Sequence, residues 1–213
     1  MKKIMLLVAC MCLYLTSLSA QDIKTIFLAM PDSITPLLSE VNKADFIDFK
    51  ASNMEAKVQN KFFRPSIMKT LTADYICIQM TENSTWQMKL LPLGDTYLVG
   101  IIETVGTNVK DSRLYLYDLD WQALTAESYQ VKVQLADFFK SSAKSSDQVL
   151  ESSLKALDIH TYLYSFSANT LELVIEFTGL NYLDQELQKK IKDFIKQKLT
   201  YQWKTEGFFQ IQD

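Results

Sequence analysis

The stretch from residue 74 to residue 117 alternates apolar and polar side chains, and this alternation limits the folds open to the chain. Apolar side chains recur at every second position, and they are Ile76, Ile78, Met80, Trp86, Met88 and Leu90. A period of two is typical of a β-strand with one inward and one outward face. Turns at Gly94-Asp95 and across 106–112 leave only short links between the segments. Such links favour an antiparallel meander.

Residues 97–105 are mostly apolar, with Glu103 the one charge, which predicts a strand covered on both faces. Further strands are predicted over 114–117, 131–135, 161–166, 171–177 and 208–211, with a hairpin turn at Ala168-Asn169. Helices are predicted over 22–30, 36–52, 147–157 and 182–199. In the second of these, Thr35 is the expected cap and Pro36 the first helical residue. This order indicates an α+β fold in which an antiparallel sheet, a meander plus a C-terminal hairpin, packs with several helices.

The N-terminus has the three parts of a secretory signal peptide. Two lysines precede an apolar run from Ile4 to Leu15, and small residues lead to Ala20. The apolar run has 12 residues, whereas a helix needs about 20 to cross a bilayer. We therefore expect cleavage after Ala20, with cleavage after Ser19 as the close alternative, and no membrane span in the mature form. The protein is then periplasmic or secreted, or, because Leu7-Val8-Ala9-Cys10 resembles a lipobox, lipid-anchored at Cys10.

The segment 140–146, rich in serine and lysine, is the best internal boundary. We expect a signal peptide at 1–20 and a single α+β domain at 21–213. The alternative is two lobes, 22–139 and 147–213, joined by this linker. Loss of residues 1–20 removes two lysines and no acids, so the net charge changes from −3 to −5. An acidic chain of this kind does not attract nucleic acid.

Several chemistries are excluded or disfavoured by residue counts. His160 is the single histidine, so a multi-histidine metal site within one chain is impossible. Five glycines, none in a phosphate-binding loop, argue against nucleotide chemistry. Cys77 stays alone after cleavage, which leaves no internal disulfide and predicts a buried structural thiol. No metal and no other cofactor is expected.

Two groups of residues remain as candidates for a site. Asp118 and Asp120 flank Leu119. Of the acidic residues in the chain, they are the best candidate pair for a carboxylate-dependent hydrolase acting on glycan or peptide. The second group is aromatic, and its residues would serve binding, because flat rings with a polar edge suit a carbohydrate or peptide platform. The candidate binding residues are Tyr115, Tyr117, Trp121, Tyr162 and Tyr164. No catalytic residue is assigned.

Asp32-Ser33-Ile34 resembles the Asp-Ser/Thr-apolar triplet that some Gram-negative anaerobes O-glycosylate in exported proteins. The alternative is that Asp32 or Ser33 caps a helix. Several longer stretches together resemble a known family. They are residues 29–33, 46–49, 52–54, 68–72, 74–75 and 84–92, of which the last is the most specific. Over roughly residues 1–130 the chain resembles an uncharacterised family, a domain of unknown function, of exported proteins from Gram-negative gut anaerobes. The resemblance implies an envelope location, favours modification of Ser33, and supplies no catalytic residues.

The absence of catalytic motifs, together with the aromatic strands, favours a non-enzymatic exported protein. We expect it to bind an envelope protein, a peptide or a glycan through a sheet face. A carboxylate-dependent hydrolase and a structural component of an envelope assembly are the alternatives. The sequence leaves the oligomeric state open.

Overall fold

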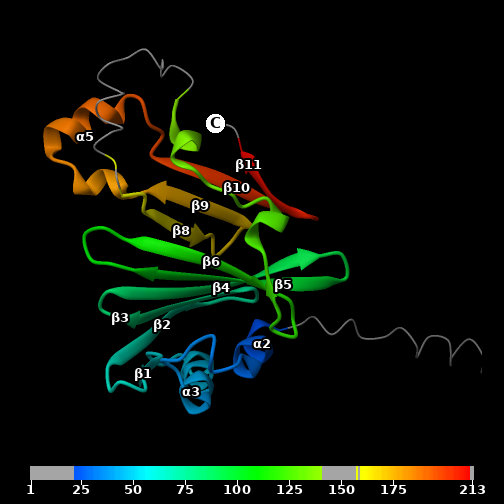
Figure 1. Cartoon of the computed structure of the whole chain (residues 1–213). Helices are drawn as coiled ribbons and strands as arrows, with labels where there is room; N and C mark the ends of the chain where they lie inside the picture. The colour runs from blue at the N-terminus through cyan, green and yellow to red at the C-terminus, as the bar shows by residue number, and fades with distance from the viewer. Residues whose placement is uncertain (1–21, 141–156, 158, 212–213) are drawn as a thin grey trace, which may run out of the picture.

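The computed structural model describes residues 22–140, 157 and 159–211, and its elements form three layers (Figure 1). Two helices lie below a seven-stranded antiparallel sheet, and a four-stranded antiparallel sheet lies above it. The expected signal peptide (1–20), the boundary segment beyond residue 140 and the expected helix 147–157 up to residue 156 lie outside the described residues. The two sheets and their helices confirm the α+β fold.

The helices are α2 (Ile23–Ala29), α3 (Glu40–Ala51) and α5 (Gln185–Lys192), and the short 3₁₀ turns are η1 (Ala126–Tyr129), η2 (Leu135–Phe138) and η3 (Gly179–Tyr182). The strands of the large sheet are β1 (Lys57–Gln59), β2 (Pro65–Leu71), β3 (Tyr75–Thr81), β4 (Ser84–Leu93), β5 (Thr96–Val105), β6 (Asp111–Tyr117) and β7 (Ala123–Leu124). Those of the small sheet are β8 (Tyr162–Phe166), β9 (Glu172–Phe177), β10 (Lys198–Lys204) and β11 (Gly207–Ile211).

The large sheet contains the predicted meander, β3 to β6, and its strands pair in chain order from β1 to β7. The sequence does not predict β1, β2 and β7, which extend the meander at both edges. The long strands β4 and β5 lie at its centre and are buried on both faces. Alternate residues of β5 therefore point to opposite layers: Val99 and Ile101 pack toward the helices, whereas Leu98 and Ile102 pack toward the small sheet. The prediction of a strand covered on both faces is confirmed.

The helix layer is held on the sheet by an apolar cluster. Phe27 of α2 and Phe46 of α3 are fully buried there, and the Phe27 ring lies 5.9 Å from the ring of Trp86 on β4. α2 begins at the cap Asp22, whose side chain accepts the backbone amide of Lys24. Burial of rings and aliphatic side chains is the main force that joins the two layers.

The small sheet docks on the opposite face through a second apolar cluster, which includes Leu91 and Leu116 of the large sheet and Leu173 and Ile175 of β9. Polar contacts fix the docking. Gln87 Oε1 accepts the backbone amide of Phe166 at 3.0 Å, and Trp203 Nε1 donates to the carbonyl of Pro92 at 2.7 Å. Residues on both sides of the serine- and lysine-rich segment thus share one apolar cluster.

Three predicted elements are wrong in part. The second helix begins at Glu40 with Ser39 as its cap, not at Pro36, because Ser39 and Asn42 form a reciprocal capping box. Residues 131–135 do not form a strand. Their alternation buries Val131 on the small-sheet side, but they pair with no strand among the described residues. The helix predicted over 182–199 ends at Lys192, and β10 follows it.

Candidate functional site

Three of the five predicted binding residues come together on the helix-side face of the large sheet. Tyr115 and Tyr117 of β6 stand opposite Ile101 and Val99 of β5. Because Ile101 and Val99 point toward the helices, both tyrosines lie on the helix-side face. The Tyr117 ring lies 5.9 Å from the ring of Trp121 at a tilt of 58°. We call Tyr97, Tyr115, Tyr117 and Trp121 the aromatic shelf; all four are half-buried at the margin of the helix-side cluster.

Trp121 is held in place by a tight turn between β6 and β7. Its φ of 62° lies in the left-handed region, which bulky residues rarely adopt. Asp118 maintains the turn: its Oδ1 accepts the backbone amides of Asp120 at 3.0 Å and Gln122 at 2.8 Å, while its carbonyl accepts that of Trp121 at 3.2 Å. A bulky side chain in a strained backbone position often marks a functional site.

One charged pair borders the shelf. Glu103 of β5 stands directly opposite Arg113 of β6 and on the same face as Tyr115. Burial raises the pKa of the Glu103 carboxyl, and Arg113 partly opposes the shift. Burial also raises the pKa of Tyr117, with further contributions from Tyr115 and Glu103. At neutral pH Tyr117 therefore keeps its phenolic hydroxyl group, which can donate a hydrogen bond.

Tyr162 and Tyr164, the other two predicted binding residues, lie elsewhere. Both belong to β8 and pack against the apolar cluster between the sheets. The Tyr162 ring stacks on Phe138 at 5.8 Å, and burial raises the pKa of Tyr164 to about 12. Their placement assigns these rings to docking of the small sheet, and a binding role for them stays a prediction.

The remaining titratable candidates are not gathered into a catalytic group. The carboxylate of Asp118 is engaged in the turn that holds Trp121, as described above. His160 Nε2 lies 3.0 Å from the carbonyl of Leu157. Cys77 is half-buried beneath the small sheet, and burial raises the pKa of its thiol, while Tyr75 and Lys69 act in the opposite direction. Across the part of the chain that the structure describes, no three acidic, histidine or cysteine side chains form a cluster suited to a metal ion.

Ser33 lies exposed in the turn between α2 and α3. Its neighbour Asp32 accepts a hydrogen bond from Lys61 at 2.7 Å, and this contact lowers the pKa of the carboxyl. Neither Asp32 nor Ser33 caps a helix, because the caps of α2 and α3 are Asp22 and Ser39. Exposure makes the Ser33 hydroxyl accessible, and its modification stays a prediction.

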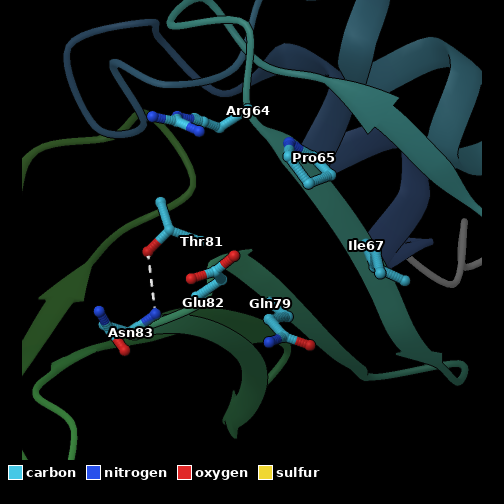
Figure 2. Close-up of a pocket in the computed structure, with 7 residues that line it drawn as sticks. All are labelled: Arg64, Pro65, Ile67, Gln79, Thr81, Glu82 and Asn83. Carbon is cyan, nitrogen blue, oxygen red and sulfur yellow. Dashed lines mark hydrogen bonds between the residues drawn. The ribbon is translucent and has the colours of Figure 1, made fainter.

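Two features escape prediction from the sequence. Tyr97 belongs to the shelf, and its place two residues before Val99 in the same strand is the signal that could have identified it. A cavity of about 450 Å³ opens beside the β1–β2 hairpin, on the face of the large sheet away from the helices (Figure 2). Its lining residues come from two hairpins and are Arg64, Pro65, Ile67, Gln79, Thr81, Glu82 and Asn83.

Within residues 22–140 and 159–211, no helix is both long and apolar enough to cross a membrane.

Comparison with known proteins adds a fold and a family. No curated protein matches the chain. A solved structure of a domain of an uncharacterised protein from Porphyromonas gingivalis W83 is similar, with a TM-score of 0.79 and 21% sequence identity. The match covers 89% of this chain and 98% of that domain, and at this identity it supports the fold alone. A family model matches residues 15–208, so the chain belongs to the family described as protein of unknown function (DUF3256).

Proposed function

We propose that the protein is a non-enzymatic exported binding module that holds its ligand on the aromatic shelf. The observation that carries the proposal is the strained Trp121, whose ring is held beside Tyr117 by the Asp118 turn. A left-handed backbone costs a bulky residue about 1–2 kcal/mol. Gly or Asn would avoid that cost, so a requirement for the indole ring itself explains why tryptophan stands there. The exported location is part of the proposal and rests on residues 1–20.

A glycan is the ligand that the shelf fits best. Aromatic rings offer flat apolar faces, and the phenolic groups at their edges donate and accept hydrogen bonds. A sugar ring has the same two features, an apolar face and a rim of hydroxyl groups. An extended peptide that adds a strand needs a free sheet edge, whereas the shelf lies on a sheet face. Peptides and proteins are therefore the alternative ligands.

A glycan array probed with the purified protein tests the proposal, with a peptide array in parallel. We expect one class of glycan to be retained by the wild-type protein, and Tyr117→Ala or Trp121→Gly to weaken that binding at least about tenfold, as loss of a central aromatic contact does. Tyr182→Ala is the matched control, because this exposed tyrosine lies outside the shelf. Binding that survives both shelf substitutions would place the ligand elsewhere, and retention of peptides alone would replace the glycan.

A further inference from the structure

The turn between β1 and β2 presents two phenylalanines to solvent. The side chains of Phe62 and Phe63 are 69% and 82% exposed, and Phe63 has a left-handed φ of 58°. A turn position of this kind suits Gly or Asn, so phenylalanine there is unfavourable both to the backbone and to the surface. Nothing within the described residues covers these rings, so they are available for a contact with another molecule.

The turn is rigid before any contact is made. Asn60 is buried, and its Oδ1 accepts the backbone amides of Phe62 at 3.0 Å and Arg64 at 3.2 Å. Its Nδ2 donates to Ser66 Oγ at 3.1 Å and to the carbonyl of Met80 at 3.3 Å, which ties the turn to β2 and β3. A fixed turn loses little conformational entropy on binding, so even a small contact can contribute affinity.

The cavity of Figure 2 begins where this turn ends. Arg64 and Pro65 on one side, and Thr81, Glu82 and Asn83 on the other, border a space of about 450 Å³. Cavities of about 150 Å³ hold a benzene ring, so this one has room for two phenyl groups. A projecting pair of rings and a hollow thus lie side by side on one edge of the molecule.

The rim of the cavity carries both signs of charge. Arg64 and Glu82 are exposed, and neither has an ion-pair partner among the described residues. A twofold contact requires one surface to be complementary to itself, with every contact made twice. A projection beside a hollow, and a cation beside an anion, satisfy that requirement. We propose that Phe62 and Phe63 of one copy insert into this cavity of a second copy, with Arg64 of each facing Glu82 of the other.

The dimer is weak because the contact is small. A buried phenylalanine covers about 150–250 Å², and about three quarters of each ring is exposed. The four phenylalanines of a symmetric pair therefore bury roughly 600 Å² of their own surface. With a similar area on the cavity walls, the total only reaches the lower limit of stable interfaces, about 1,200 Å². Self-association is then concentration-dependent and readily reversible.

Sedimentation equilibrium over about 10 to 500 µM, a range suited to weak interfaces, tests this proposal. The mean mass of the wild-type protein should rise toward twice that of the monomer, and Phe62→Ser with Phe63→Ser should raise the dissociation constant at least about tenfold. Met54→Ser is the control, since Met54 is 57% exposed and lies outside the turn and the cavity. A mass that stays monomeric throughout, or an unchanged dissociation constant for the serine variant, overturns the proposal.

A charge swap identifies the contact itself. Arg64→Glu and Glu82→Arg each place like charges across the twofold axis, so each variant alone should be monomeric. An equimolar mixture restores both opposite-charge pairs and should dimerise. Both side chains are exposed, so both variants keep the fold. A mixture that remains monomeric overturns the proposal. So does binding of the phenylalanines to phosphatidylglycerol vesicles without self-association, because it assigns them to a membrane.

Discussion

Replacing Gln87 with leucine removes a side chain that joins the two sheets. Gln87 is 7% exposed, and its Oε1 accepts hydrogen bonds from the Tyr75 hydroxyl at 3.1 Å and the Phe166 amide at 3.0 Å. Leucine has no acceptor, so both buried donors lose their partner. Each unsatisfied donor costs about 1–3 kcal/mol. The Tyr75 hydroxyl can rotate, whereas the Phe166 amide cannot, so we expect a total loss of about 2–4 kcal/mol in the free energy of unfolding.

Urea unfolding followed by circular dichroism measures this loss. Gln79→Leu is the matched control, because Gln79 lies on the same face of the large sheet at the cavity of Figure 2. The Gln79 side chain is half-buried and makes no hydrogen bond with the described residues, so this change should stay within about 0.5 kcal/mol of the wild-type protein. Tyr75→Phe removes one of the two hydrogen bonds and should cost about 1 kcal/mol. If Gln87→Leu costs no more than the control, the small sheet does not dock on β4 as described, and the three-layer account fails.

Three further predictions concern the shelf and the sheet interface. Trp121→Gly relieves backbone strain of about 1–2 kcal/mol and loses a ring pair worth about 0.5–1.5 kcal/mol; the unfolding free energy should therefore change by less than about 1 kcal/mol, and a loss above 3 kcal/mol would make the ring a core residue. Gly100→Ala places a Cβ 2.7 Å from the Phe166 ring, so overpacking of about 1–3 kcal/mol should lower the thermal midpoint, and an unchanged midpoint would contradict this contact. Glu103→Gln should stabilise the protein at neutral pH, because the raised pKa of Glu103 makes the wild-type protein lose stability as pH rises above the usual value of 4.5; unfolding measured against pH should show this advantage vanish in acid, and an equal advantage at all pH values would refute the burial argument.

Alternation predicts β3 to β6 correctly because each strand packs at least one face in an apolar layer. It fails at β10, where Leu199 fits two patterns. Leu199 continues the helical spacing of Leu187 and Ile191, and it also begins the alternation that Tyr201 and Trp203 complete. The segment forms a strand because it pairs with β9. A local sequence pattern does not reveal such a long-range pairing.

The site is predictable to a similar extent. The alternation in β6 places Tyr115 and Tyr117 on one face, because Leu116 on the opposite face is buried against the small sheet. The left-handed conformations of Trp121 and Phe63 could not be predicted, since such positions are recognised by Gly or Asn. Both arise from side-chain hydrogen bonds of Asp118 and Asn60 to the turn backbone.

Quenching of tryptophan fluorescence by acrylamide tests the central claim, ligand binding on the shelf, most directly. Of the chain's three tryptophans, Trp86 and Trp203 are buried at 1% and 3% exposure, so quenching reports mainly on the half-buried Trp121. A saturating amount of the glycan retained on the array should lower the quenching constant of the wild-type protein and of Tyr182→Ala. Quenching that is unchanged by the bound glycan would contradict the claim that Trp121 and the shelf hold the ligand.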